Sequence, residues 1–292
     1  MDHDNTLKSL LFPGETNKFF DIESLPPMEI EAKGFSKVNA WWLAEVSRLI
    51  YKQESDEIGN KATSTTRNEI LNRLNLNERK FYNKSGTQCA IIESNDKKFA
   101  ILVFRGSHEL KDWLANANVP PTKISNGCRI HSGFKRALDL VWKKVRTELD
   151  KMDCPVFYTG HSLGAALATI AAYRKSPHSL YTFGSPLVGN GKFKKSFKGK
   201  KAYRIVNNRD IVATVPRMFK YQHTGQCHYI SNDNSILINP RNKIIKFDKK
   251  IIDESLSDTT NESQPFKDLP EFLGDHSPIN YVAHMQRQLS NT

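Results

Sequence analysis

The segment 155–168 carries residues whose types and spacing suit nucleophilic catalysis, and it reads PVFYTGHSLGAALA. An apolar, strand-like run leads into a GxSxG motif centred on Ser162, and a helix rich in small residues is expected after it. Such a strand–turn–helix lifts the serine hydroxyl above the sheet. It also places the backbone N–H of Leu163 where an oxyanion would develop. The alternative is a tight glycine turn with an idle serine, but the flanking strand and helix favour catalysis.

A serine nucleophile needs a base, and the base needs an orienting carboxylate. In sites of this kind the three residues follow in the chain order Ser, Asp, His. Asp210 comes shortly after the strand-like run 203–206. This places it at the carboxyl end of a predicted strand, where ligand sites of α/β sheets lie. Later acids such as Asp233 lie in polar turns and read as solvated surface charge, so Asp210 is the predicted acid.

Four histidines are candidates for the base: His223, His228, His276 and His284. The first two flank a predicted hairpin, where structural hydrogen bonding explains them. His284 falls within the last predicted helix, where it reads as an ordinary helix-face residue. His276 precedes that helix, in a loop that can reach across the sheet, and it is the predicted base. His161, beside the nucleophile, is expected to point away as a packing or hydrogen-bonding residue.

Helices and strands that could position these residues alternate along the chain, which predicts a mainly parallel sheet. Helices are expected from about 33 to 51 and over 133–149, 165–174 and 278–289. Strands are expected over 87–93, 99–104, 156–159, 180–183 and 203–206, with a short one at Ile130. Strands near 226–230, 236–238 and 243–247 are expected as a terminal antiparallel addition.

Length and composition narrow the possible classes of protein. The chain has 292 residues, with 15 Gly and 13 Pro, so it is neither collagen-like nor of low complexity. No run of about 18 apolar residues exists, and no membrane-spanning helix is expected. The first 30 residues, broken by Pro13-Gly14 and Pro26-Pro27, are predicted to form an extension. One α/β domain is predicted to follow over residues 31–292.

The N-terminal residues and the cysteines indicate in which cellular compartment the protein is expected. The first residues, MDHDN, lack the basic region and apolar core of a secretory signal. Cys89, Cys128, Cys154 and Cys227 are widely spaced, which excludes a zinc ribbon and disfavours a disulfide scaffold. We therefore expect a cytoplasmic protein, or one exported without a cleaved signal. A single disulfide and the oligomeric state stay open.

The sequence resembles the class 3 lipases, the fungal-type triacylglycerol lipase family of the α/β-hydrolase fold. The resemblance extends from about residue 39 to 281 and follows seven blocks in order. The blocks are Val103–Ser107, Asp112–Asn116, Ile130–Phe134, Tyr158–Gly164, Tyr181–Asn190, Val206–Val212, and Asp275-His276 with Tyr281.

The resemblance implies an α/β-hydrolase with a mainly parallel central sheet and helices on both faces. It implies Ser162 as nucleophile, Asp210 as acid and His276 as base, with N–H groups of Ser107 and Leu163 forming the oxyanion hole. No metal or organic cofactor is implied. The expected activity is hydrolysis of acyl glycerolipids by a serine esterase. Two alternatives stay open: a phospholipase A1-like or lysophospholipase-like enzyme, and a lipase-like protein that binds lipid without turnover.

A short apolar pattern follows Ser107. Leu110, Trp113 and Leu114 are spaced i, i+3, i+4, as on an amphipathic helix. In the family that it resembles, a lid that covers the site occupies this place. A fixed helix docked on the core explains the pattern equally well.

The formal net charge of +12 comes from 43 Lys and Arg against 31 Asp and Glu, and favours acidic partners. Half of the excess lies in one segment, where the lysines are Lys192, Lys194, Lys195, Lys198, Lys200 and Lys201. These lysines could contact an anionic membrane. The alternative is a solvated lysine face with Phe193 and Phe197 in the core. Nucleic acid is not an expected partner, because no aromatic platform or known basic module accompanies the charge.

Overall fold

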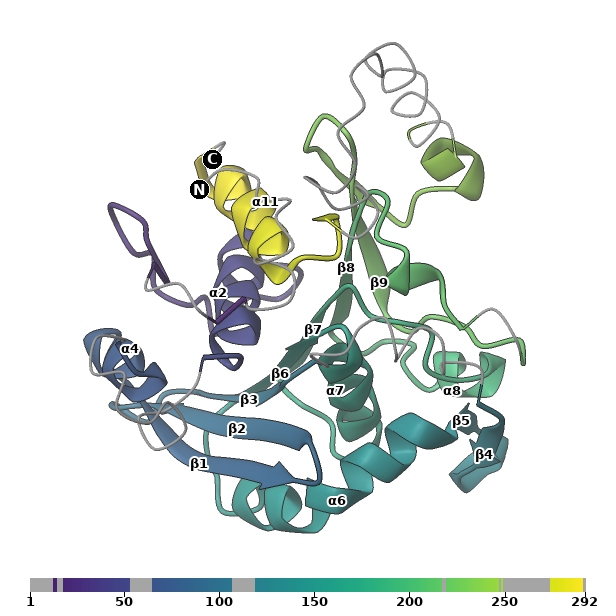
Figure 1. Cartoon of the computed structure of the whole chain (residues 1–292), viewed down its shortest axis with the longest axis horizontal. Coiled ribbons are helices and arrows are strands. Elements are labelled where there is room, and N and C mark those ends of the chain that lie inside the picture. Colours follow the sequence, from purple (N-terminus) through teal and green to yellow (C-terminus); the bar gives the residue numbers. More distant parts are fainter. Residues whose placement is uncertain are drawn as a thin grey trace, which may run out of the picture.

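A mixed eight-stranded sheet forms the centre of the molecule (Figure 1). The computed structural model describes residues 13–14, 18–52, 65–106, 119–216, 219–246, 248 and 274–290. Within these ranges the sheet has the order β1-β2-β3-β6-β7-β8-β9-β10. Its strands are β1 (Leu76–Lys84), β2 (Thr87–Ser94), β3 (Ala100–Phe104), β6 (Val156–His161), β7 (Ser179–Phe183), β8 (Ala202–Asn207), β9 (Gln226–Ile230) and β10 (Ile236–Ile238). A separate two-stranded sheet pairs β4 (Pro121–Lys123) with β5 (Arg129–His131).

The middle of the large sheet is parallel. Strands β3, β6, β7, β8 and β9 pair in parallel, whereas β1, β2 and β10 add antiparallel edges. Both β3 and β7 are buried at every position. Continuous burial is typical of parallel strands that are covered on both faces. The predicted fold class, a mainly parallel α/β sheet with helices, is confirmed.

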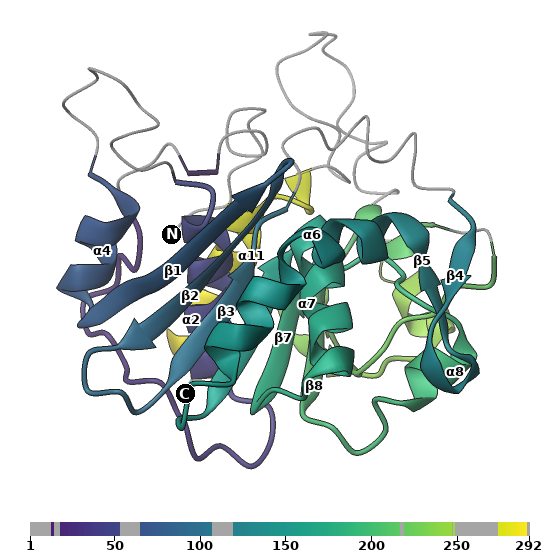
Figure 2. The same ribbon diagram turned by 90° about the horizontal axis from the view of Figure 1, so that it is seen from below.

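Helices cover the two faces of the sheet, as Figure 2 shows with α6 and α7 in front and α2 and α11 behind. The helices are α2 (Lys37–Leu49), α4 (Arg67–Arg73), α6 (Ser132–Leu149), α7 (Leu163–Arg174), α8 (Gly191–Lys195) and α11 (Pro278–Ser290), with short 3₁₀ turns at Ser125–Gly127 and Val212–Thr214. On α6 the buried residues recur every three or four positions, as an amphipathic helix requires. The nine residues Gly164–Ala172 of α7 are all buried, and most are small, so this helix lies close to the strands.

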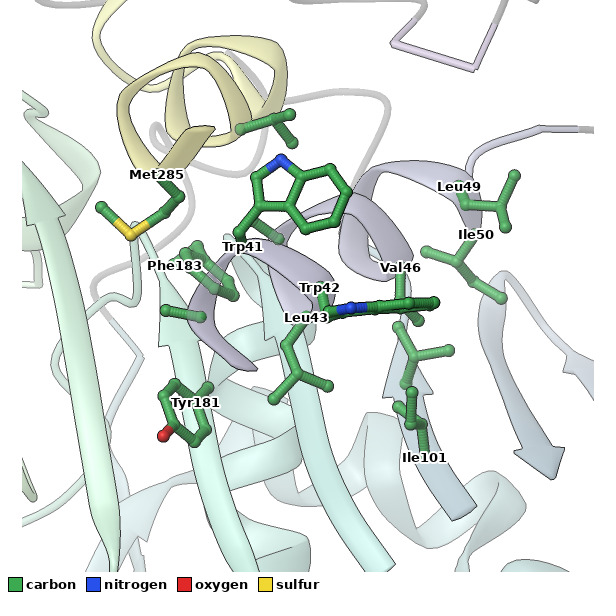
Figure 3. Packing of buried hydrophobic residues seen from close by; sticks show 14 of the residues in the cluster. Trp41, Trp42, Leu43, Val46, Leu49, Ile50, Ile101, Tyr181, Phe183 and Met285 are labelled. Carbon is green, nitrogen blue, oxygen red and sulfur yellow. The ribbon is translucent and has the colours of Figure 1, made fainter. Parts of the chain in front are cut away.

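The apolar core on the second face joins the first long helix to the last. Figure 3 shows Trp41 and Trp42 of α2, Tyr181 and Phe183 of β7, and Met285 of α11 packed together. Helices α2 and α11 pack side by side although more than 200 residues separate them in sequence. Burial of this apolar surface is the main favourable contribution to folding.

Part of the region predicted as an N-terminal extension lies against α2. Phe19 and Phe20 are buried, and the Phe20 N–H donates to Glu45 Oε1 at 2.9 Å. Glu45 is itself buried and forms an ion pair with Arg48 at 2.7 Å. The Arg48 guanidinium also donates to the Lys18 carbonyl. Residues 18–20 are therefore fixed to the helix by apolar and polar contacts.

Two expectations for the C-terminal strands were wrong. Strand β9 pairs with β8 in parallel, not antiparallel. The connection between them spans 18 residues, 208–225, which is long enough for a crossover. Residues 242–246 are helical, not a strand. Pro240 cannot donate to a ladder, and the Ile244 and Ile245 N–H groups bond back to the Arg241 carbonyl.

Two further observations concern the described residues as a set. All four cysteines are free, and Cys89 and Cys128 are buried. None of the helices in the described ranges combines the length and apolar content needed to cross a bilayer.

Candidate active site

Ser162 occupies a sharp turn between β6 and α7. Its backbone has φ 58° and ψ −127°, a left-handed conformation that is costly for a residue with a Cβ. The Ser162 N–H donates to the Phe183 carbonyl of the neighbouring strand at 3.0 Å. The side chain is 2% exposed. The turn predicted from the GxSxG motif is therefore present, and it holds the serine at the carboxyl edge of the parallel sheet.

Two glycines allow this turn to form. A Cβ on Gly164 would lie 2.1 Å from the Phe104 carbonyl oxygen of β3. A Cβ on Gly160 would lie 2.5 Å from the Gly164 backbone. Real contacts of this kind are never so short, so both positions require glycine. Their absent side chains let α7 begin directly above β3 and β6.

Asp210 and His276 meet at the same edge. Asp210 follows β8, and His276 precedes α11. His276 Nδ1 lies 2.9 Å from each carboxylate oxygen of Asp210, and both residues are buried. The Val212 N–H donates to Asp210 Oδ1 at 2.8 Å. The structure thus brings the predicted acid and the predicted base into contact.

The sequence analysis missed the role of Tyr281 beside the acid. The Tyr281 hydroxyl donates to Asp210 Oδ2 at 2.6 Å and accepts from the Asn207 N–H at 3.0 Å. Burial, and then the charge of Asp210, raise the pKa of Tyr281, so its hydroxyl stays a donor. Five residues, little more than one helical turn, separate Tyr281 from His276. Its place in the block with Asp275-His276 was the signal of this position in the sequence.

His161 takes part in the site more closely than expected. Its ring lies 4.4 Å from that of His276, centroid to centroid. His161 Nε2 lies 2.7 Å from the His276 carbonyl oxygen, and Nδ1 lies 3.3 Å from the Tyr51 hydroxyl. Burial, and then the neighbouring His276, hold the pKa of His161 well below its usual range. The neutral ring therefore donates to the His276 backbone and accepts from Tyr51.

The reacting face of His276 is sequestered. Its Nε2 is buried and has no hydrogen-bond partner within the described residues. Leu163 is the first residue of α7, a position whose N–H has no acceptor inside the helix. His276 Nε2 could therefore act as the base for Ser162, and the Leu163 N–H could act as an oxyanion donor. Ser107, Leu110, Trp113 and Leu114 lie outside the described residues.

The other histidine candidates lie elsewhere. His223 Nε2 bonds to the Ala213 carbonyl at 2.7 Å. The His228 ring stacks on Phe35, 3.7 Å between centroids. His284 Nδ1 contacts Asn234 Oδ1 on the loop before β10. Each has a structural contact of its own, which leaves His276 as the histidine beside Asp210.

The lysine-rich segment forms a short helix and a turn rather than one long helix. Phe193 and Phe197 are buried, as the core-packing alternative expected. Five of the six lysines are exposed. The sixth, Lys201, is partly buried, and its Nζ donates to the Ala32 carbonyl at 2.9 Å. Lys201 is therefore separate from the other five.

The site can be compared with known proteins. Residues 101–220, which include Ser162 and Asp210, match the sequence model of the family described as Lipase (class 3). The chain is 33% identical over 161 residues to secreted mono- and diacylglycerol lipase 1 of Fusarium solani, covering 50% of this chain and 48% of that protein. It is 33% identical over 168 residues to a lipase of Rhizomucor miehei, covering 51% and 46%. The chain thus spans about half the length of these curated relatives.

A solved structure extends the match to most of the fold. The crystal structure of a lipase from Rhizopus microsporus var. chinensis superposes with a TM-score of 0.59 at 26% sequence identity. The match covers 78% of this chain and 88% of that one. The resemblance inferred from the sequence blocks is confirmed. Residues 101–220 match the class 3 lipase family, and the fold of the chain, an α/β-hydrolase fold, is similar to that of a solved fungal lipase.

Proposed function

We propose that this chain is a carboxylic ester hydrolase that cleaves acyl glycerolipids with Ser162, Asp210 and His276. The observation that carries the proposal is the contact between Asp210 and His276 Nδ1 at 2.9 Å, at the sheet edge where Ser162 occupies a left-handed turn. The expected mechanism is acyl transfer through an acyl-enzyme intermediate.

In the first half-reaction, His276 Nε2 takes the proton of Ser162 Oγ as the oxygen attacks the ester carbonyl. Asp210 accepts the Nδ1–H of His276, which fixes the tautomer and stabilises the imidazolium. The Leu163 N–H, together with that of Ser107 by analogy with the family, would hold the oxyanion. One such donor is worth about 3 kcal/mol of transition-state energy in related enzymes.

The first half-reaction ends when the alcohol leaves, and the second repeats these steps with water. His276 gives its proton to the leaving alcohol, which departs and leaves the acyl group on Ser162. Water then enters, and His276 accepts a proton as the water oxygen attacks the acyl carbonyl. His276 returns that proton to Ser162 Oγ as the bond between Oγ and the acyl carbon breaks. The products are a free acid and a regenerated serine, so no co-reactant besides water is needed.

A fluorophosphonate probe tests the nucleophile directly. The wild-type protein is expected to be labelled, and Ser162→Ala to lose all labelling. Ser185→Ala is the matched control, because Ser185 is also buried and its hydroxyl donates to the Pro186 carbonyl. A wild-type protein that is folded by circular dichroism but unlabelled would instead support the lipid-binding alternative without turnover.

The substrate class rests on the names of the relatives, which include a mono- and diacylglycerol lipase. We propose acylglycerols as substrates of this chain too. p-Nitrophenyl esters of increasing acyl length test this, and faster hydrolysis of octanoyl than of acetyl esters is expected. A sharp preference for acetyl esters would contradict lipase activity.

A phospholipase A1-like or lysophospholipase-like activity is the second candidate. The exposed lysines of the segment 192–200 favour it, because a basic surface suits lipids with phosphate headgroups. A screen of mono- and diacylglycerols against phosphatidylglycerol and its lyso form separates the two candidates. Turnover that is lost in Ser162→Ala identifies the preferred headgroup.

A further inference from the structure

A second concave site lies beside α8, away from Ser162. It is a groove of about 850 Å³. Lysines Lys192, Lys194, Lys195, Lys198 and Lys200 line it, and we call it the lysine groove. Its remaining lining residues are neutral: Asn190, Gly191, Phe197, Gly199, Gln222, Gly225 and Gln226. The position of α8 at the end of the molecule near β4 and β5 is visible in Figure 2.

The charge of the lysine groove is uncompensated. No acidic residue is among the described residues that line it. None of its five lysines forms an ion pair with a carboxylate anywhere in the described ranges. By contrast, Lys135, Lys151 and Lys175 on neighbouring helices and loops each have a carboxylate partner within 2.8 Å. The groove therefore carries five positive charges that no carboxylate within the described ranges neutralises.

The backbone that carries these lysines is fixed by buried phenylalanines and by hydrogen bonds to β5. Phe193 is fully buried and Phe197 is 4% exposed, and their rings are 5.4 Å apart. Asn190 Oδ1 accepts from the Phe193 N–H at 3.0 Å and from the Arg129 N–H at 3.1 Å. This ties α8 to β5. The positions from which the lysines project are therefore set before any ligand arrives.

The lysine groove is remote from the catalytic edge. Lys200 lies just before the start of β8, and Gln226 is the first residue of β9. Asp210 follows the other end of β8. At about 3.3 Å per residue, the six residues of β8 span about 17 Å between their first and last Cα atoms. This end of the lysine groove is thus separated from Asp210 by the length of β8.

We propose that the lysine groove binds a compact anion that carries several phosphate groups. Lysine is a strong point-charge partner for phosphate, and the amides of Asn190, Gln222 and Gln226 can add hydrogen bonds. A volume of about 850 Å³ lies within the range of small-molecule sites. Because five lysines line one concave site, a compact ligand with several phosphate groups can contact more than one of them.

Calorimetric titration with inositol hexakisphosphate at 150 mM salt tests the proposal. The full chain carrying Ser162→Ala is used, so the readout requires no ester hydrolysis and stands whether or not the proposed enzymatic function is right. The triple variant K192Q/K195Q/K198Q is expected to bind roughly 100-fold more weakly, since each lysine near an anionic group contributes a several-fold gain. The matched control K84Q/K143Q/K144Q removes three exposed lysines that do not line the lysine groove and is expected to bind as the parent does.

Vesicle flotation distinguishes a headgroup on a lipid from a free polyphosphate. Vesicles with phosphatidylinositol bisphosphate are compared with phosphatidylserine vesicles of equal total charge. Stronger retention on the bisphosphate vesicles, lost in K192Q/K195Q/K198Q, assigns the ligand to a lipid. Binding of the soluble anion without vesicle retention assigns it to a free polyphosphate. Absent titration heat at 100 µM, equal loss in the two triple variants, or retention that is present and equal on both vesicle types would each overturn the proposal.

Discussion

Asp210 shows how a single buried charge is accommodated in this fold. Its side chain is fully buried, and three donors reach its two oxygens: His276 Nδ1, the Tyr281 hydroxyl and the Val212 N–H. A buried carboxylate without such partners would be strongly destabilising. The donors come from the loop before α11, from α11 itself and from the turn after Asp210. The charge therefore holds three parts of the chain together.

Tyr281→Phe removes one of the donors to Asp210, the Tyr281 hydroxyl, and so tests how much that donor contributes. The substitution removes the donor to Asp210 and the acceptor for the Asn207 N–H while keeping the ring. Hydrogen bonds to charged groups contribute about 1.5–3 kcal/mol, so the free energy of unfolding in urea is expected to fall by about that amount. Tyr173→Phe is the control, because the Tyr173 hydroxyl bonds to Ser125 near the surface. An equal loss in both variants would show that Tyr281 contributes only as an ordinary polar contact.

At the scale of elements, the turn between β6 and α7 depends on close contact with β3. The nearest atom to a Cβ on Gly164 belongs to the backbone of Phe104, which cannot move without shifting β3. The same strand leads directly to Gly106 and the residues after it. One backbone contact therefore sets the position of the Ser162 turn relative to the end of β3.

Gly164→Ala is expected to separate α7 from β3 and displace Ser162. Overpacking of this kind costs about 1–3 kcal/mol of stability. A displacement near 1 Å lowers catalytic rates about 100-fold. Thermal unfolding measures the loss of stability. The rate of fluorophosphonate labelling measures the effect on catalysis. Gly34→Ala is the matched control, because a Cβ there meets no atom within 4 Å, and it should leave both quantities unchanged.

The elements that the sequence predicted well are those with a strong apolar period. The helix 133–149 and the strands 156–159 and 180–183 fall within one or two residues of α6, β6 and β7. Strand β1 was missed because its sequence, LNERKFYNK, is rich in charge, as befits an edge strand that is only partly buried. The direction of β9 was mistaken because strand direction depends on the path of the crossover, which leaves no local pattern.

The site was predicted in outline for similar reasons. Ser162 stands in a local motif, and chain order pointed to Asp210 and His276. The contacts of Tyr281, His161 and Tyr51 join segments that are 71 to 115 residues apart. Such contacts arise from packing between helices and sheet and carry no periodic signal in the sequence.

At the scale of the whole molecule, three histidines of the described residues are held in neutral form. Burial keeps the pKa of His161 and His223 well below the usual range. Burial, and then the charge of Arg204, lower the pKa of His228 to about 4. In the unfolded chain all three regain a pKa near 6.5, so below that pH the unfolded state binds more protons. Their contribution to stability is complete above about pH 6.5 and is lost as the pH falls toward 4.

Urea unfolding at pH 7.5, 6.5, 5.5 and 4.5 tests whether stability decreases as the pH falls. The free energy of unfolding is expected to decrease below pH 6.5, with each histidine contributing up to about 1.4 kcal/mol per pH unit. His223→Gln keeps an N–H for the Ala213 carbonyl but cannot be protonated. Its free energy of unfolding should therefore fall less steeply with decreasing pH than that of the parent, and the difference should equal the contribution of one histidine. A stability that stays level from pH 7.5 to 4.5 would contradict the burial of neutral imidazoles.

The packing of α11 on α2 has a consequence for how the chain becomes competent during synthesis. Ser162 leaves the ribosome first, and His276 follows 114 residues later. At 5–20 residues per second this interval is roughly 6–23 s. Under the proposed mechanism, the nascent chain has its nucleophile throughout that interval but neither its base nor the helix that holds the acid. We therefore expect esterase activity only once α11 docks against α2.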